Sequence, residues 1–485
     1  MSRGRIIAAG MAGALLLSAG GYVTADIYDV VPGVLTLDEP VDPDTLPNPA
    51  PEGGPEPEVP GLVQIPVAAG RVERGSVPTT APTPDPAALA AAVETQLAAP
   101  GFFGSAAVVI ADGVTGAVLY ERDAQRPVTP ASTQKLISGA GVLLTLDPDD
   151  RLTTSAVRTG ADTIALVAGG DTMLARDHGD PQAVEGRAGI ADLAEQVVES
   201  LAEEGTLPHQ VTVSVDMSYA AGPRYAPNWN MEDIALGYNQ GVTMIGLAGQ
   251  RPRPFHPSPP EPEKEAVAAF VAALATAGLP AQVAADPVLT TPVAGSVLGE
   301  VHSATIAELT TFAMDLSENA LTENLARQAS AAVGGPADFQ GVADFLLKTV
   351  AELGIDTSGA RMMDASGMSY DQKMPARLIS DLISAGTTGA EPRLQPLVAG
   401  LPVAGLSGTL RDRYRATSTS GVAGIPRAKT GTINQTIALA GTTTTRDGRL
   451  LTFVAIADKV PREGRLEAQL ALDRLTTALT ECGCR

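Results

Sequence analysis

The fold prediction rests on the stretch Pro130-Ala131-Ser132-Thr133-Gln134-Lys135, which precedes an apolar run from Leu136 to Leu144. A proline ahead of apolar residues three and four apart predicts a helix that begins near Ala131. Residues i and i+3 share a helix face, so we expect the Lys135 amine to lie against the Ser132 hydroxyl. Backbone N–H groups at that helix end also favour negative charge. The stretch therefore predicts a serine nucleophile with its own base.

A Ser-x-x-Lys pair alone is usually an exposed serine and a solvated lysine, so its assignment as a catalytic pair depends on two further motifs. They are Ser317-Glu318-Asn319 and Lys429-Thr430-Gly431-Thr432, in that order along the chain. The chain has only six lysines in 485 residues, and two of them fall in these motifs. The ordered set therefore favours a catalytic site over scattered surface residues.

Ser-x-x-Lys, Ser-x-Asn and Lys-Thr-Gly in this order resemble the motifs of penicillin-binding proteins and serine β-lactamases. Three more stretches narrow the resemblance to the class C low-molecular-mass penicillin-binding proteins, which are D-alanyl-D-alanine carboxypeptidases and endopeptidases. These stretches are Gly169–Leu174, Asp364–Ser369 and Leu401–Leu410. Within them, Gly-Asp-Thr replaces the family's usual Gly-Asp-Pro, and Asp-Ala-Ser-Gly replaces Asp-Gly-Ser-Gly. The resemblance covers about residues 86 to 478.

Composition excludes several other classes of function. The formal charge of −22 argues against a nucleic-acid partner, whose phosphates require clusters of Lys and Arg. The four histidines are scattered and no His-Glu-x-x-His or Cys-x-x-Cys occurs, so we expect no metal and no cofactor. Cys482 and Cys484 stand near the C-terminus, where we expect a frayed tail and not a disulfide framework.

Residues 1–25 have the pattern of an export signal, with Arg3 and Arg5 ahead of an apolar run and Val23-Thr24-Ala25 after it. The run is near the length at which a cleaved signal peptide and a retained membrane anchor are hard to separate, so membrane contact through residues 6–23 stays open. Residues 26–84 are rich in proline and acidic residues and predict a linker without a core. We therefore expect an exported protein of the periplasmic or cell-wall space, either secreted or anchored at its N-terminus.

Both ends of the folded region offer strands and a helix to one sheet. Asp112-Gly113 and Asp447-Gly448 are each flanked by β-rich runs, which predicts two hairpins. Helices are predicted at 87–94, with Asp85 as N-cap, and at 465–479. The residues alone support an α+β protein. The resemblance implies the serine β-lactamase-like transpeptidase fold, whose antiparallel sheet is built from both chain ends.

The 185 residues between Ser132 and Ser317 exceed what such a core needs, so we expect a domain inserted at 155–297. The catalytic domain would then comprise residues 85–154 and 298–480. Within the insertion, a proline-rich loop is predicted at 251–263. The other predicted elements there are strands at 163–167 and 211–215 and helices at 190–203 and 265–277.

The resemblance implies a role for each residue of the first two motifs. Ser132 would attack the carbonyl of a D-Ala-D-Ala bond while Lys135 accepts its proton. We expect burial and the nearby cation Lys429 to lower the pKa of Lys135. Ser317 would relay a proton to the leaving amine, and Asn319 would hold the substrate's amide. The structural alternative for Ser317 is a helix N-cap.

The third motif predicts an edge strand beside the substrate. Gly431 would leave room for a ligand's backbone to approach. The backbone N–H groups of Ser132 and Thr432 would form the oxyanion hole. Lys429 and the hydroxyls of Thr430 and Thr432 would bind the terminal carboxylate. The structural alternative is a solvated lysine before a turn.

A specificity pocket is expected from Trp229, Asp233 and Tyr238, because family members carry a similar set of residues there. Asp233 would pair with the free ammonium of a diaminopimelate-like residue, with Tyr238 and Trp229 packing on its aliphatic stem. The alternative is that Trp229 is an ordinary packing residue and Asp233 a helix cap.

These observations predict a serine-type D-Ala-D-Ala carboxypeptidase that acts on peptidoglycan stem peptides and is covalently inhibited by β-lactams. DD-endopeptidase activity stays open. A β-lactamase would share the nucleophile and the fold, but the long insertion argues against it. A non-catalytic penicillin-binding wall or sensor module would keep the fold and lose turnover, which three intact motifs argue against. A histidine-based hydrolase is disfavoured because no Gly-x-Ser-x-Gly occurs and no histidine stands beside a motif.

Overall fold

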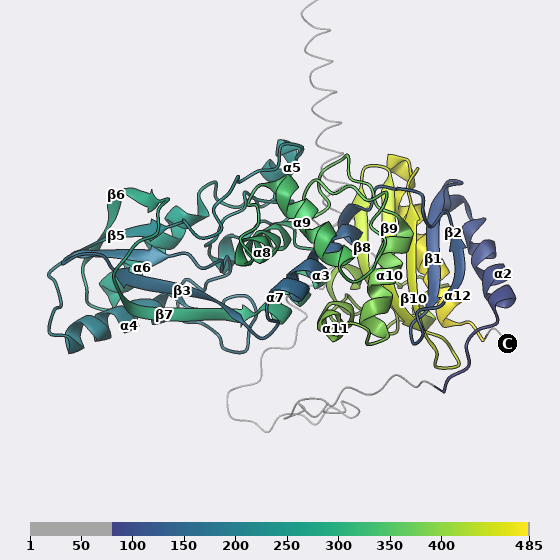
Figure 1. Ribbon diagram of the computed structural model, residues 1–485, viewed down its shortest axis with the longest axis horizontal. Helices are drawn as coiled ribbons and strands as arrows, with labels where there is room; N and C mark the ends of the chain where they lie inside the picture. Colours follow the sequence, from purple (N-terminus) through teal and green to yellow (C-terminus); the bar gives the residue numbers. More distant parts are fainter. Residues whose placement is uncertain (1–79, 484–485) are drawn as a thin grey trace, which may run out of the picture. The chain divides into compact units, whose positions relative to one another are not determined.

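The computed structural model describes residues 80–483, which belong to one compact unit (Figure 1). The predicted signal or anchor at residues 1–25 and all but the last few residues of the linker at 26–84 lie outside the described residues. No helix within residues 80–483 is long and apolar enough to cross a bilayer.

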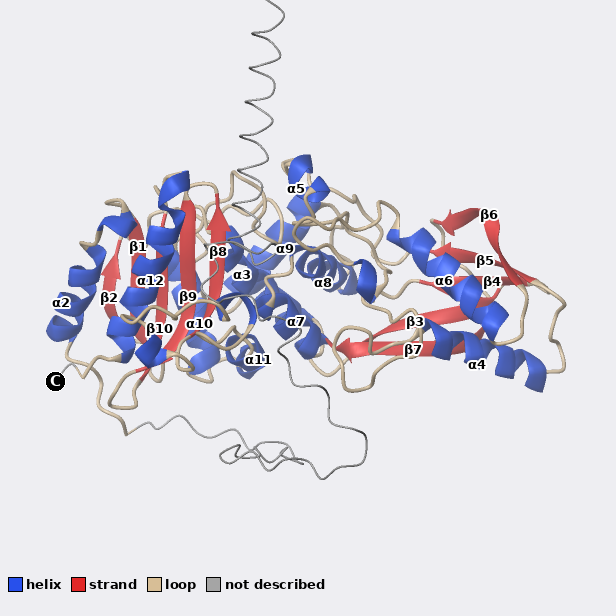
Figure 2. Cartoon of the chain, turned by 180° about the vertical axis from the view of Figure 1, so that it is seen from behind, coloured by secondary structure: helices blue, strands red, loops and turns tan. Residues whose placement is uncertain are grey.

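The first of two sheets is antiparallel throughout, with strand order β2-β1-β10-β9-β8, and its strands appear in red in Figure 2. Both predicted hairpins are confirmed, since Val109 pairs with Glu121 and Leu450 pairs with Thr444. The two chain ends meet where β1 pairs with β10. The strands are β1 (Ala106–Asp112), β2 (Val118–Arg122), β8 (Arg427–Ile433), β9 (Thr436–Thr444) and β10 (Leu450–Ala457).

Both faces of this sheet are covered by helices, because side chains of successive strand residues point to opposite faces. Val108 and Ile110 of β1 pack in one apolar cluster with residues of α2 (Pro86–Leu97) and α12 (Arg465–Thr480). Val109 packs in a second cluster with residues of α10 (Ala376–Thr387). The Asp85 side chain caps α2 as predicted.

The second apolar cluster also contains the helices that surround the nucleophile. Leu136 and Ile137 of α3 (Lys135–Thr145) are fully buried in it. The helices packed around α3 are α7 (Ile306–Asp315), α8 (Asn319–Ala332), α9 (Phe339–Ala351) and α11 (Gln395–Ala399).

The second sheet has strand order β6-β5-β4-β3-β7 and mixes parallel and antiparallel pairs. Its first strand along the chain, β3, begins at Arg151 and its last, β7, ends at Thr305, which is wider than the range 155–297 predicted for the insertion. The division into two domains stays a prediction. The strands are β3 (Arg151–Arg158), β4 (Thr163–Val167), β5 (Val211–Asp216), β6 (Ala281–Leu289) and β7 (Ser296–Thr305), and the helices are α4 (Ile190–Glu203), α5 (Met231–Ala235) and α6 (Pro262–Thr276).

Two local expectations need correction. The predicted helix near Ala131 begins with a 3₁₀ turn, η3 (Ala131–Gln134), and the α-helix starts only at Lys135. Such tight turns are common at helix ends. The C-terminal tail is not frayed at Cys482, whose side chain is buried against the cluster formed by α2, α12 and the first sheet, while Cys484 lies outside the described residues.

Candidate active site

Ser132 and Lys135 lie together as their spacing predicts, with Lys135 Nζ 2.9 Å from Ser132 Oγ. Lys135 is completely buried, while Ser132 keeps part of its surface exposed. Lys135 Nζ also donates to Asn319 Oδ1 (2.6 Å) and to the backbone carbonyl of Ser366 (2.6 Å). The amine is therefore held by three oxygen atoms from three segments of the chain.

Asn319 stands at the first position of α8 and joins the first motif to the second. Its Nδ2 donates to the backbone carbonyl of Tyr238 (2.6 Å), and the Met368 sulfur lies 3.2 Å away. A thioether is a weak acceptor, so the second N–H of this amide is only weakly bonded. It remains able to donate to a ligand carbonyl.

Ser317 adopts a left-handed backbone conformation, with φ of 57°, in the turn that joins α7 to α8. Its backbone N–H donates to the carbonyl of Met314 (3.3 Å), and its side chain is partly exposed. The N-cap alternative is wrong for Ser317, because Glu318 caps α8 by accepting from the N–H of Leu321 (2.7 Å). A non-glycine residue with positive φ is uncommon and costs free energy, so the surrounding turn must hold Ser317 in place.

The third motif lies on β8, at the edge of the first sheet, as predicted. Figure 1 shows β8 beside α3, and η3 packs against β8. Thr432 is exposed and Thr430 half-buried, with Thr430 Oγ1 donating to Thr409 Oγ1 (2.9 Å). The Leu401–Leu410 stretch, noted above for its resemblance, thus contacts the third motif through Thr409.

The role expected of Gly431 needs correction. A Cβ on Gly431 would lie 3.0 Å from the Pro130 carbonyl oxygen and 3.2 Å from Ala131 Cβ. Such contacts are tighter than most real Cβ contacts. The glycine therefore leaves room for the turn that carries the nucleophile, and not for the backbone of a ligand.

The two motif lysines differ in what lowers their pKa. Burial lowers the pKa of Lys135 to about 8, although the carboxylates of Asp364, Glu323 and Glu318 oppose the shift. Burial and then the charge of Lys135 lower the pKa of Lys429 well below its usual range. Burial therefore lowers the pKa of Lys135 as expected, whereas the part expected of the Lys429 charge stays a prediction.

Trp229 is not part of an open pocket. Its side chain is 6% exposed, its Nε1 donates to Asp364 Oδ2 (2.8 Å), and its ring packs edge-on against Phe339 with centroids 5.0 Å apart. The expectation that Trp229 packs on a substrate side chain is therefore wrong, and the packing alternative describes it. Through Asp364 it ties the 151–305 region to the loop beside the nucleophile.

Asp233 and Tyr238 remain accessible. Asp233 is half-buried on α5, and burial together with Glu232 raises its pKa. It is not the cap of this helix, because Asn230 accepts from the N–H of Glu232. The Tyr238 ring is 43% exposed and packs edge-on against Phe255.

A polar cavity of about 580 Å³ lies next to both the nucleophile turn and the third motif. Thr129, which directly precedes Pro130, and Asn434 and Gln435, which directly follow β8, are among its lining residues. The remaining lining residues include three cations, Lys373, Arg462 and Arg465. They also include one acid, Asp458, which forms an ion pair with Arg126.

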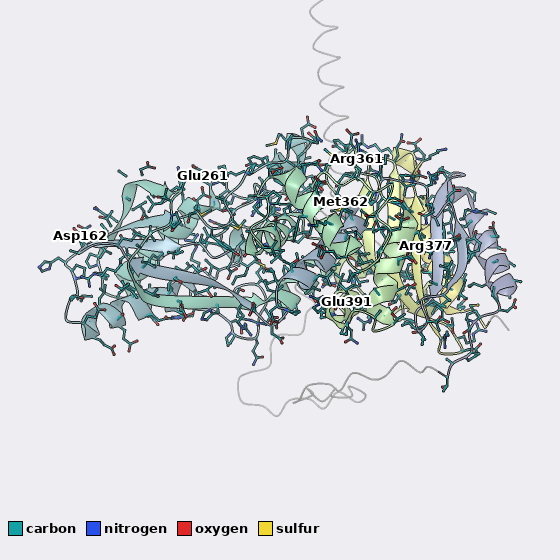
Figure 3. The ribbon with its side chains drawn as sticks, in the orientation of Figure 1. Asp162, Glu261, Arg361, Met362, Arg377 and Glu391 are labelled. Atoms are coloured by element: carbon teal, nitrogen blue, oxygen red, sulfur yellow. The ribbon has the colours of Figure 1, made fainter. Side chains whose placement is uncertain are left out.

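The Asp364–Ser369 loop supports the site in a way that the motifs did not reveal. Figure 3 labels Arg361 and Met362, which lead into this loop. Asp364 accepts hydrogen bonds from the N–H groups of Gly367 and Ser369 (both 2.8 Å) and from Gln372 Nε2 (2.9 Å). The folded loop places the Ser366 carbonyl on Lys135. No sequence motif identifies a backbone carbonyl as a functional group.

Within residues 80–483, three potential metal ligands come together only at His178, Asp192 and Glu195. His178 Nδ1 lies 2.6 Å from Asp192 Oδ1 and its Nε2 lies 3.7 Å from Glu195 Oε1. Both ring nitrogens thus face carboxylates, and Asp192 raises the pKa of His178 by hydrogen bonding. This geometry is that of an ion pair on the surface of α4 and the loop before it.

Comparison with known proteins agrees with this site. The family model of the D-Ala-D-Ala carboxypeptidase 3 (S13) family matches residues 89–251 and 245–479. The chain is 37% identical to carboxypeptidase DacB of Mycolicibacterium smegmatis, over 84% of this chain and 88% of that protein. It is 34% identical to carboxypeptidase Rv3627c of Mycobacterium tuberculosis, over 85% and 88% of the two chains.

The fold is shared with a solved structure at much lower identity. Penicillin binding protein 4 of Haemophilus influenzae superposes with a TM-score of 0.63 at 16% identity, covering 77% of this chain and 95% of that one. With its motifs, its fold and a family match over most of its length, the chain belongs to the D-Ala-D-Ala carboxypeptidase 3 (S13) family of low-molecular-mass penicillin-binding proteins and is a D-Ala-D-Ala carboxypeptidase.

Proposed function

We propose that this carboxypeptidase cleaves the D-Ala-D-Ala end of peptidoglycan stem peptides through an acyl-enzyme on Ser132. The observation that carries the proposal is the 2.9 Å contact between Lys135 Nζ and Ser132 Oγ at a completely buried amine. A neutral amine has two N–H donors and one lone pair. Asn319 Oδ1 and the Ser366 carbonyl can only accept, so they take the two donors and leave the lone pair for the Ser132 hydroxyl.

The proton balance of acylation follows from this arrangement. Lys135 takes the hydroxyl proton as Ser132 Oγ bonds to the substrate carbonyl carbon, and the C–N bond to the terminal D-Ala breaks. The proton taken by Lys135 must then pass to the leaving amine, and Ser317 is the relay that we assign to this step. Water then hydrolyses the ester and restores Ser132.

The substrate's amide and carboxylate have separate partners in this proposal. The weakly bonded N–H of Asn319 Nδ2, which faces the Met368 sulfur, would donate to the amide carbonyl on the acyl side. The backbone N–H groups of Ser132 and Thr432 would stabilise the oxyanion. Thr430, Thr432 and Lys429 would hold the terminal carboxylate, whose charge would raise the pKa of Lys429.

Charged parts of the stem peptide have two candidate partners beside the nucleophile. Asp233 is half-buried and suits a free side-chain ammonium, with the exposed ring of Tyr238 nearby in sequence. The cavity with Lys373, Arg462 and Arg465 suits a carboxylate. Asp233→Asn should slow cleavage of a peptide with a free side-chain amine much more than cleavage of its acetylated form. Equal slowing of both peptides would make Asp233 a structural residue.

We also propose that the enzyme works outside the cytoplasm, because the N-terminal pattern at residues 1–25 is that of an export signal and the proposed substrate is cell wall. Fractionation of cells that express the full chain, compared with a chain lacking residues 1–25, tests this. Enzyme in the cytoplasmic fraction from both chains would contradict it.

The central test is the intact mass of the purified protein after exposure to a β-lactam. We expect one covalent adduct on wild type and none on Ser132→Ala, because no other serine or threonine has a lysine three residues later. Ser330→Ala, at the far end of α8, serves as the control and should keep the adduct. Full labelling of Ser132→Ala would overturn the proposal, and rapid hydrolysis of the adduct on wild type would favour a β-lactamase.

A further inference from the structure

Glu323 is a buried acid that the catalytic scheme does not use. It lies on α8, four residues after Asn319, and its side chain is 3% exposed. Burying a carboxyl group is costly unless hydrogen bonds compensate for the lost water. The hydrogen bonds that Glu323 makes therefore indicate its structural role in the core.

These contacts are with backbone of the Asp364–Ser369 loop. Glu323 Oε1 accepts from the N–H groups of Ala365 (3.0 Å) and Ser366 (2.7 Å), and Oε2 lies 3.1 Å from the Ala365 nitrogen. Two successive N–H groups thus converge on one carboxyl group. This fixes the peptide unit between Ala365 and Ser366.

The same stretch of backbone reaches the proposed base from its other side. The Ser366 carbonyl accepts from Lys135 Nζ (2.6 Å), and the Ala365 carbonyl accepts from Ser138 Oγ on α3 (2.6 Å). The next residue, Gly367, has φ of 88°, and a Cβ there would lie 2.3 Å from the Ala131 carbonyl oxygen. The loop is therefore clamped between α8 and the turn that carries the nucleophile.

We propose that Glu323 is a positioning residue for Lys135, which it orients through the backbone of Ala365 and Ser366. The inference rests on the proposed function, in which Lys135 is the base. Without the Glu323 acceptor, two buried N–H groups would lose their partner and the loop would relax. The Ser366 carbonyl would then leave the amine, which would lose one of the two acceptors that direct its lone pair to Ser132.

The charges around Glu323 add an electrostatic consequence. It faces Lys135 on α3, Asp364 in the loop and Arg327 on its own helix. Burial and the Asp364 carboxylate raise the pKa of Glu323 to about 8. When Glu323 loses its proton, its charge stabilises the Lys135 ammonium and delays release of the lysine proton to higher pH.

Two substitutions of Glu323 distinguish its positioning role from the effect of its charge. Glu323→Met keeps the length of the side chain and removes the acceptor, so we expect the limiting rate of β-lactam acylation to fall about tenfold to a hundredfold. Glu323→Gln keeps an oxygen that can accept both N–H groups and removes the charge. It should keep most of the limiting rate, while the midpoint of the rate–pH profile moves to lower pH.

The controls are Ser330→Ala, which removes the hydrogen bond from Ser330 Oγ to the Pro336 carbonyl at the far end of α8, and Lys135→Ala. Ser330→Ala should change neither the rate nor the midpoint. A Glu323→Met enzyme that acylates at the wild-type limiting rate would overturn the inference, as would a Glu323→Gln enzyme with an unchanged midpoint. The Gln variant decides the question if the Met variant does not fold. Wild-type acylation by Lys135→Ala would instead overturn the proposed function.

Discussion

The surroundings of Lys135 and Lys429 form two regions of one active site, and both side chains are completely buried. Lys135 Nζ contacts three oxygen atoms and lies near three carboxylates. Among the described residues, Lys429 Nζ donates only to the carbonyl of its own neighbour Thr430 (3.1 Å), with Asp315 as the one acid that raises its pKa. The two lysines are therefore equally buried, but far more oxygen atoms and carboxylates stabilise the ammonium form of Lys135 than that of Lys429.

This difference in surroundings predicts different roles for Lys135 and Lys429. The partners of Lys135 keep its pKa near 8, where it can hold and release a proton close to neutral pH. Lys429 has fewer such partners among the described residues, so a carboxylate ligand is a group that would raise its lowered pKa. We therefore expect Lys135 to serve in proton transfer and Lys429 in recognition of an anion.

The largest expected effect comes from removing each amine in turn. Lys135→Ala should slow β-lactam acylation by about 10²- to 10⁴-fold, because the base is lost. Lys429→Ala should act mainly on KM for a D-Ala-D-Ala peptide. Stopped-flow acylation and steady-state kinetics measure the two effects, with Lys348→Ala, an exposed lysine on α9, as the control. If both variants lost acylation rate and peptide affinity to the same extent, the proposed difference in role between Lys135 and Lys429 would be contradicted.

A smaller effect is expected in the pH profile. Acylation by wild type should rise with pH through about 8, as Lys135 loses its proton. Lys429→Met should leave this midpoint in place, because burial and three carboxylates, and not Lys429, set the shift of the Lys135 pKa. A midpoint that moves to higher pH in Lys429→Met would show that the charge of Lys429 does lower the pKa of Lys135.

The smallest effect concerns stability. Between pH 8 and about 10 the unfolded chain binds a proton at residue 135 that the folded chain has released, so the free energy of unfolding should rise with pH. Lys135→Met should remove this contribution. Lys429→Met should raise Tm more than Lys135→Met, which leaves Asn319 Oδ1 and the Ser366 carbonyl without their donor. Urea and thermal unfolding at pH 7.5 and 9.5 would check this, and a lower Tm for Lys429→Met would contradict it.

Local spacing was the part of the site that the sequence could predict. The contact between Ser132 and Lys135 follows from helical geometry, and the edge strand at Lys429–Thr432 from a β-rich run after a glycine. The sequence did not predict which way a side chain faces in the folded protein or which distant group it contacts. Trp229 and Gly431 have the expected residue types but face the protein and not the ligand. Glu323 bonds to backbone N–H groups some forty residues away, and backbone carries no residue-specific signal.

The pairing of β1 with β10 has a consequence for how the chain acquires activity. Ala106 lies opposite Ala457, so β1 has no partner on its β10 side until nearly the whole chain has been made. Closing so large a loop is slow compared with local helix formation. β8 carries Lys429 and packs against η3, so the site beside Ser132 is incomplete until the C-terminal strands are in place. We therefore expect hydrolytic activity to begin only when these strands complete the sheet.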